Sequence, residues 1–191
     1  MAKRFGTIEK RKMLLMVIAA VAAVAVIITG AVLITGNRSK KIQTAQDFFD
    51  TVHSYRDLTV VEDTKYVTAA QECLDVKGKT IAYVVTAYGE GFADKVSVRC
   101  FFDLKKKTLI GIQVAEQYET NGSGANIATS MFTQRFEYTK MPLWFNDGSI
   151  SEEDSAKMKG TCVDTLSGAT VSSRAVVEAV NAAYTYYVDN M

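Results

Sequence analysis

The 191-residue sequence predicts an α+β fold: one N-terminal transmembrane helix followed by an outer domain with an antiparallel sheet packed by helices. Three observations predict it. An uncharged apolar run covers residues 13–35, three strand-like runs lie between residues 80 and 118, and a helical segment covers residues 171–188 near the end of the sequence. The expected organisation is a cytoplasmic tail at 1–12, a transmembrane helix at 13–35 and an extracytoplasmic domain at 36–191.

The apolar run reads MLLMVIAAVAAVAVIITGAVLIT and has 23 residues without a charge. At ~1.5 Å per residue, it is long enough to cross a hydrocarbon layer of ~30 Å. A cleavable signal peptide is the alternative, because Lys10, Arg11 and Lys12 precede the run. Signal-peptide cores have only roughly 7–15 apolar residues, however, and no A-x-A-like site closes this run. We therefore expect a retained anchor.

The charges around this run predict its orientation. Five Lys and Arg precede it and three follow within a few residues, so the positive-inside rule places the N-terminus in the cytoplasm and the domain on the extracytoplasmic side of the inner membrane. From Ile42 onward the chain has 14 Lys and Arg against 20 Asp and Glu, a net charge of −6. This acidic balance argues against nucleic-acid binding.

The outer domain is expected to begin with an amphipathic helix at 42–55, followed by one or two short strands between Leu58 and Ala70. Strand-like runs then occur at Thr80–Tyr88, Lys95–Asp103 and Thr108–Tyr118, separated by turn signals. We interpret them as an antiparallel meander. Leu104–Lys107 would form a basic hairpin tip; a docking patch is the alternative.

A glycine-rich break at Glu119–Gly124 precedes the next expected helix, Ala125–Phe136. The irregular segment MPLWF and a polar loop at Asp147–Lys159 lead to the last expected helix, Val171–Val188.

The cysteines and the histidine indicate neither a disulfide framework nor a metal site. Cys73, Cys100 and Cys162 are few and form no C-x-x-C motif. Cys162 is interpreted as a small buried residue, with a redox role or a bridge to Cys100 as the alternative. His53, the only histidine, is expected on the surface of the first helix.

The stretch DTLSGATVSS, from Asp164 to Ser173, lies just before the last expected helix and is rich in hydroxyl groups. Such side chains serve as N-caps of a helix, and the free amides of a first turn also bind anions. Phosphate could approach the backbone closely at Gly168 and Ala169, with Arg174 one turn into the helix. The G-x-x-x-x-G-K spacing of a nucleoside-triphosphate loop is absent. From the residues alone, a plain helix cap and a phosphate site both remain open.

The sequence SGATVSS, with Asp164 three residues earlier, resembles the flavinylation motif of the FMN-binding domain family. The resemblance implies that the hydroxyl of Thr170 is esterified to the phosphate of FMN by a separate flavin transferase that uses FAD. It also implies that neighbouring residues of the motif bind the cofactor: Asp164, Ser167, Gly168, Ala169, Ser172 and Ser173.

Two further stretches resemble the same family. AYGEGFADKVSV is similar to its aromatic-glycine turn between two strands, and AEQYETNGSGANI to its segment beside the flavin. The residues that match in the second stretch are Glu119, Thr120, Gly122 and Gly124. Asn121 stands where Pro is usual, and Ser123 where Leu is common. Glu119 would bond to the flavin ring or else be a capping or solvated acid.

The aromatic residues Tyr88, Tyr118 and Trp144 would stack on the flavin or else belong to the core. One tail, one anchor and one such domain is a layout that resembles the G-subunit family of Rnf-type ion-translocating electron transport complexes. The resemblance implies a membrane flavoprotein that relays electrons between neighbouring subunits, without catalytic residues of its own or a metal.

Two other functions remain open. The chain would otherwise be a stand-alone extracytoplasmic FMN carrier, or a non-redox membrane-anchored binding module whose hydroxyl cluster caps a helix.

Overall fold

The structure is a computed structural model that describes residues 44–61, 66–105, 107–145, 150–151, 153 and 157–191. Ile42–Met191 forms one compact unit. Within the described ranges, every helix is too short or too polar to cross a membrane. The cytoplasmic tail and the transmembrane helix at 13–35 lie outside these ranges and stay predictions.

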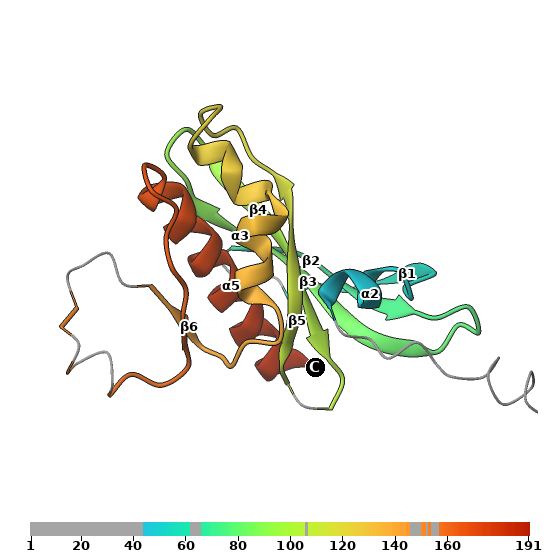
Figure 1. Cartoon of the computed structure of the whole chain (residues 1–191). Helices are drawn as coiled ribbons and strands as arrows, with labels where there is room; N and C mark the ends of the chain where they lie inside the picture. The colour runs from blue at the N-terminus through green and yellow to red at the C-terminus, as the bar shows by residue number, and fades with distance from the viewer. Residues whose placement is uncertain (1–43, 62–65, 106, 146–149, 152, 154–156) are drawn as a thin grey trace, which may run out of the picture. The chain divides into compact units, whose positions relative to one another are not determined.

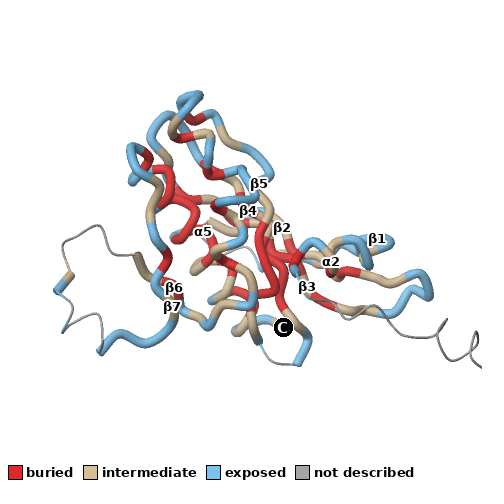
Figure 2. The backbone as a smooth tube through the Cα atoms, in the orientation of Figure 1, coloured by how far each residue is buried: buried red, intermediate tan, exposed pale blue. Residues whose placement is uncertain are grey.

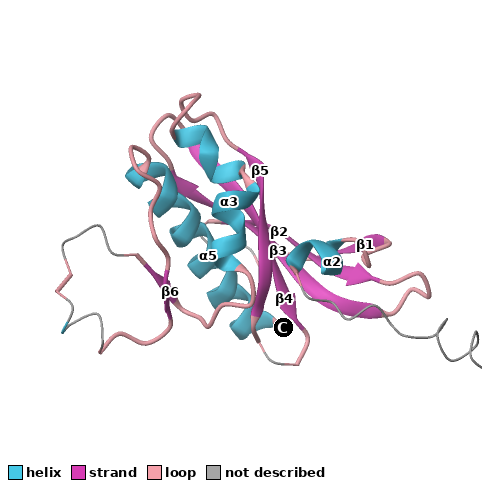
Figure 3. Cartoon of the chain, in the orientation of Figure 1, coloured by secondary structure: helices cyan, strands magenta, loops and turns pink. Residues whose placement is uncertain are grey.

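The unit is built on a five-stranded antiparallel sheet whose strands follow one another in chain order (Figures 1 and 3). This connectivity is a meander, as expected. The strands are β1 (Ser54–Leu58), β2 (Val67–Leu74), β3 (Thr80–Glu90), β4 (Lys95–Asp103) and β5 (Leu109–Glu116). The predicted α+β class with an antiparallel sheet is confirmed.

The central strands lie close to where the sequence predicts them. β4 has the predicted bounds, and β5 is shorter than predicted at both ends. β3 continues two residues further than expected, because Glu90 still pairs with Lys95. The hairpin then closes over the short turn 91–94, where the Gly91 amide donates to the Asp94 carbonyl at 3.0 Å.

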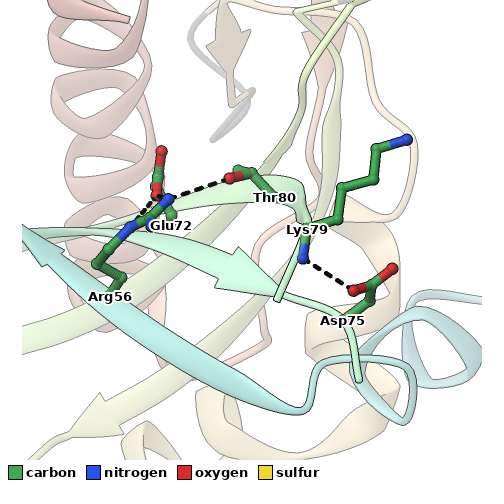
Figure 4. Close-up of polar contacts among 5 residues, drawn as sticks. All are labelled: Arg56, Glu72, Asp75, Lys79 and Thr80. Atoms are coloured by element: carbon green, nitrogen blue, oxygen red, sulfur yellow. Dashed lines mark hydrogen bonds and ion pairs between the residues drawn. The ribbon is translucent and has the colours of Figure 1, made fainter. Parts of the chain in front are cut away.

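Polar contacts stabilise the edge of the sheet where β1 pairs with β2 (Figure 4). Arg56 lies opposite Glu72 in the register and forms an ion pair with it. The Arg56 side chain also donates to the Thr80 hydroxyl at 3.5 Å. At the β2–β3 turn, the Asp75 carboxylate accepts from the Lys79 amide at 2.9 Å. This bond, together with a second one from the Lys77 amide, lowers the pKa of Asp75.

The predicted helix at 42–55 is wrong in length: the described helix is α2, Ala45–Phe49. Thr44 and Asp47 form a capping box at its start. Thr51 donates its hydroxyl to the Phe48 carbonyl at 2.6 Å, and the backbone then turns into the sheet. The amide of His53 donates to the Leu74 carbonyl at 2.8 Å, so this residue lies outside the helix. Its side chain is exposed, as expected.

The single helix predicted at 125–136 is also wrong. Three short pieces occupy this segment: η1 (Gly124–Ala128), α3 (Ser130–Thr133) and η2 (Gln134–Phe136). The break lies at Thr129, which has an extended backbone with ψ 152°. Its hydroxyl donates to the Asn126 carbonyl at 2.7 Å and so competes with continuation of the helix.

Helix α5 (Thr170–Asn190) packs along β3 and β4 on one face of the sheet (Figure 1). It confirms the predicted last helix. Its buried residues include Ala175, Ala179 and Ala183, whose small side chains let the helix lie close to the strands. Figure 2 shows the buried stretches of helix and strands that form this main core.

A smaller apolar cluster lies on the other face of the sheet, under α2. It joins Phe48 of α2 to Phe101 and Ile110 of the strands. The short strands β6 (Leu143–Trp144) and β7 (Thr161–Cys162) form a separate parallel pair beside α5.

Candidate functional site

The segment that the sequence predicts as the attachment motif forms a tight turn followed by the start of α5. The amide of Ala169 donates to the Leu166 carbonyl at 3.0 Å, and Gly168 has φ +74°, a conformation that favours glycine. Helix α5 begins at Thr170, and Ala169 occupies the N-cap position with no side-chain cap bond. Of the two interpretations that the residues left open, the hydroxyl N-cap is therefore not the one the structure has.

The two serines of the first turn point inward instead of capping the helix. Ser172 and Ser173 are both 2% exposed. The Ser173 hydroxyl accepts from the Leu166 amide at 3.1 Å and so closes the turn. The Ser172 hydroxyl donates to the Glu119 carboxylate at 2.5 Å.

The start of α5 has an exposed hydroxyl and backbone donors that other described residues leave without a partner. Thr170 is exposed, so its hydroxyl is accessible. The backbone amides of Thr170, Val171 and Ser172 have no hydrogen-bond partner among the described residues. These three N–H groups lie at the positive end of a 21-residue helix, an arrangement that favours a phosphate or another anion.

The loop after β5 brings Glu119 to this turn. Glu119 is 6% exposed, so the solvated interpretation of this residue is wrong. Its Oε1 accepts from the amides of Phe92 at 2.9 Å and Ala93 at 3.2 Å, in the β3–β4 turn. Its Oε2 accepts from Ser172. One carboxylate thus joins three segments that meet at one end of the sheet, uppermost in Figure 1.

The two glycines predicted in this loop have different roles. Gly122 has φ +87° and lies in a turn that is closed by the Ala125 amide and the Thr120 carbonyl at 3.1 Å. Gly124 instead leaves room for its neighbours, since a Cβ there would lie 2.8 Å from the Glu119 Cβ and 3.0 Å from the Ser172 Oγ.

A pocket of about 390 Å³ lies where these segments meet. Seven predicted site residues line it: Glu119, Thr120, Gly124, Gly168, Ala169, Thr170 and Ser172. Residues that the sequence did not single out complete the lining: Phe92, Ser123 and Val171. Phe92 is 72% exposed and Val171 47% exposed, so the pocket has apolar side chains at its mouth. Phe92 lies inside the aromatic-glycine stretch AYGEGFADKVSV, and its place there could have identified it as a site residue from the sequence.

Four predicted residues do not line this pocket: Asp164, Ser167, Gly122 and Ser173. Asp164 contributes through its backbone. The Arg135 guanidinium donates to the carbonyls of Asp164 at 2.5 Å and Thr165 at 3.4 Å, and so holds the segment that precedes the turn. The Arg174 guanidinium lies 4.8 Å from the centre of the Phe145 ring, outside the pocket lining.

The three aromatic residues considered for stacking also lie outside the pocket lining. Tyr88 packs edge-on against Tyr66, with ring centres 5.5 Å apart. Tyr118 is 67% exposed, and Trp144 belongs to β6.

The three cysteines are all free thiols. Cys73 and Cys100 are buried, whereas Cys162 is exposed. The expectation that Cys162 is a buried residue is wrong, because β7 is a short strand at the surface. The alternative bridge between Cys162 and Cys100 is also absent.

The model of the FMN-binding domain family matches residues 91–185. This range contains the β3–β4 turn, Glu119 and Thr170. A curated relative, the G subunit of the ion-translocating oxidoreductase complex of Methanosarcina acetivorans, is 32% identical over 127 residues. The match covers 66% of this chain and 62% of the relative, which is less than two thirds of the relative's length.

A solved structure has a similar fold. It is the C subunit of the Na⁺-translocating NADH-quinone reductase of Parabacteroides distasonis, with a TM-score of 0.53 and 20% identity. The superposition covers 75% of this chain and 79% of that one. At this identity, the likeness shows the fold alone.

Proposed function

Since residues 91–185 belong to the FMN-binding domain family, we propose that the chain is an electron-carrying subunit of an Rnf-type ion-translocating oxidoreductase complex, with FMN attached covalently to Thr170. When bound, FMN supplies electron transfer through its isoalloxazine ring. The protein binds and orients the cofactor and controls access to it.

The observation that supports this proposal is the pocket that joins the start of α5 to the loop after β5. Thr170, with an exposed hydroxyl, lines this pocket, and the amides of residues 170–172 have no partner within the described part of the chain. A Cβ built on Gly168 would meet nothing within 4 Å, so the backbone there is open to a bulky anion. This set of donors fits a phosphate ester of Thr170.

The attachment reaction transfers FMN from FAD. The Thr170 hydroxyl oxygen forms the new bond to the FMN phosphorus, the phosphoanhydride bond of FAD breaks, AMP leaves, and the hydroxyl proton goes to solvent. The reaction requires an accessible hydroxyl, which Thr170 has and the buried Ser172 and Ser173 do not. A separate flavin transferase is the proposed partner for this step.

The proposed location is the extracytoplasmic face of the inner membrane. It rests on the uncharged run at 13–35 and on the surplus of Lys and Arg before it. The proposed partners are other subunits of a membrane complex, because the curated relative is itself a subunit of an ion-translocating oxidoreductase complex.

The decisive experiment replaces the attachment residue. We expect the full-length chain, co-expressed with a flavin transferase, to carry the mass of one FMN and to fluoresce in a gel after denaturation. Thr170→Ala should lose the added mass and the fluorescence completely. Thr165→Ala, the same change five residues earlier and outside the pocket lining, should keep both.

The alternatives give different outcomes. A non-redox module carries no flavin in any variant, so an unmodified wild-type mass would disprove the proposal. A stand-alone carrier is flavinylated at Thr170 but purifies alone in mild detergent, without membrane subunits.

A further inference from the structure

Glu119 connects three segments that are far apart in the sequence. Its partners lie 27 and 26 residues away in the β3–β4 turn, at Phe92 and Ala93, and 53 residues away in α5, at Ser172. Ser172 is two residues after Thr170. The carboxylate therefore contacts the first turn of α5 directly, and both Glu119 and Ser172 line the same pocket.

The bonds of this carboxylate are directed into the protein. A carboxylate has about four acceptor positions, and three of them already accept from Phe92, Ala93 and Ser172. Two glycines provide the space around it. A Cβ on Gly91 would overlap Oε1, and a Cβ on Gly124 would lie 3.1 Å from Oε2.

We propose that Glu119 is a positioning residue that orients the first turn of α5, and with it Thr170, before the cofactor is attached. The purpose of this orientation, attachment of FMN, rests on the proposed function of Thr170. The bond to Ser172 fixes one side of the turn, and the bond from Leu166 to Ser173 fixes the other. Thr170, which precedes both serines, stays exposed.

The cost of losing the carboxylate follows from burial. Without Glu119, the hydroxyl of Ser172 loses its acceptor in a buried place, and the amides of Phe92 and Ala93 lose theirs in a half-buried turn. The β3–β4 turn and the start of α5 would then no longer be held together. Glutamine has the same shape; its oxygen can accept from the two amides, and its amide nitrogen can donate to the Ser172 oxygen.

The test uses the full-length chain, purified flavin-free in mild detergent and then incubated with FAD and a purified flavin transferase. The initial rate of FMN incorporation is measured by intact mass. We expect Glu119→Ala to slow it at least about tenfold and Ser172→Ala to slow it at least about threefold. Glu119→Gln should stay within about twofold of wild type, because it keeps the contacts, with the Ser172 bond reversed, and removes the charge.

Hydrogen exchange of the flavin-free chain gives a second readout that needs no cofactor. The amides of Phe92 and Ala93 should exchange about tenfold faster in Glu119→Ala and stay close to wild type in Glu119→Gln. Glu116→Ala, which removes an exposed carboxylate three residues earlier, and Ser130→Ala, which removes an exposed hydroxyl outside the motif and the pocket lining, are the matched controls.

The outcomes separate this inference from the proposed function. If the wild-type chain takes up no FMN, the proposed function is wrong, and the exchange of Phe92 and Ala93 still decides whether Glu119 organises the pocket. If the wild type is flavinylated and Ser172→Ala accepts FMN at the same rate, the positioning role is wrong. The same holds if Glu119→Gln is as slow as Glu119→Ala, since the charge would then be the important property.

Discussion

Two glycines of the sheet region are required for different reasons. Gly89 lies in β3 where α5 crosses, and a Cβ there would overlap the carbonyl oxygen of Ala175. Gly78 lies in the β2–β3 turn with φ +73°, and a Cβ there would meet nothing within 4 Å. The first position needs space, and the second needs a left-handed backbone.

We expect Gly89→Ala to destabilise the fold more than Gly78→Ala. The backbone of α5 would have to move away from β3, at a cost of about 1–3 kcal/mol or more, whereas the turn position costs about 1 kcal/mol. In a domain of this size, each kcal/mol lowers the Tm by roughly 2–4 °C. Thermal melts followed by circular dichroism would measure the difference. Equal Tm values for the two variants would contradict the close approach of β3 and α5.

At the level of single residues, the sequence predicts the position of the attachment turn better than it predicts which residues contact that turn. Hydroxyl residues before a helical pattern are a local signal, and Thr170 is indeed at the start of α5. The inward direction of Ser172 is not a local property. It depends on Glu119, 53 residues earlier, which only the folded chain brings near.

Among the elements, α5 and the β6–β7 pair are joined by one side chain. The Asn181 amide group donates to the Leu143 carbonyl at 2.7 Å, and its oxygen accepts from the Leu143 amide at 2.8 Å. Both backbone groups of Leu143 are thus satisfied by one residue of the helix. Leu143 itself is 3% exposed and packs in the main core.

We expect Asn181→Ala to lower the free energy of unfolding by about 1–3 kcal/mol, because two backbone groups of a buried residue lose their partner. Asn181→Asp should be similar, since a carboxylate oxygen would then face the Leu143 carbonyl. Urea unfolding gives the free energy, and hydrogen exchange should show faster exchange at the Leu143 amide. Asn190→Ala, which removes only a bond from an exposed side chain to the Tyr186 carbonyl one turn earlier, should change stability by less than about 0.5 kcal/mol. An unchanged exchange rate of the Leu143 amide in Asn181→Ala would contradict the role of the two Asn181 bonds.

The elements that the sequence predicts well are those with a strong internal pattern. The alternation in β4 and the long apolar stripe of α5 give nearly correct bounds. The helices predicted at 42–55 and 125–136 fail because hydroxyl and backbone bonds from outside the pattern interrupt them. Thr51 and His53 end the first, and Thr129 breaks the second.

On the scale of the whole domain, the sheet separates two apolar clusters, and each contains one buried thiol. Cys100 lies in the main core between the sheet and α5, and Cys73 in the smaller cluster under α2. The sequence predicts the α+β class, but not which face each helix covers. Adjacent β4 residues go to opposite clusters, Phe101 to the smaller and Phe102 to the main core.

Burial makes the fold sensitive to alkaline pH through these two thiols. It raises the pKa of Cys73 from 9.0 to about 12, an effect that the nearby positive charge of Arg99 partly offsets, and it raises the pKa of Cys100 further. In the folded state both thiols therefore stay protonated at a pH where the unfolded chain ionises. Their contribution to stability is complete below about pH 9, the unfolded value, and is lost as the pH rises toward the folded pKa.

We expect the free energy of unfolding to fall by about 1.4 kcal/mol for each buried thiol between pH 8 and pH 10. Burial also raises the pKa values of Tyr138 and Tyr187, which add a smaller fall near pH 10. Urea unfolding of the wild-type chain at the two pH values would show the loss from the two thiols on top of it, about 3 kcal/mol in sum. Cys73→Ala and Cys100→Ala should each remove about half of this loss, one from each face of the sheet. Cys162→Ala removes an exposed thiol and should leave the loss as large as in the wild type. If neither buried-site variant reduces the pH dependence, the two clusters do not shield their thiols as the structure indicates.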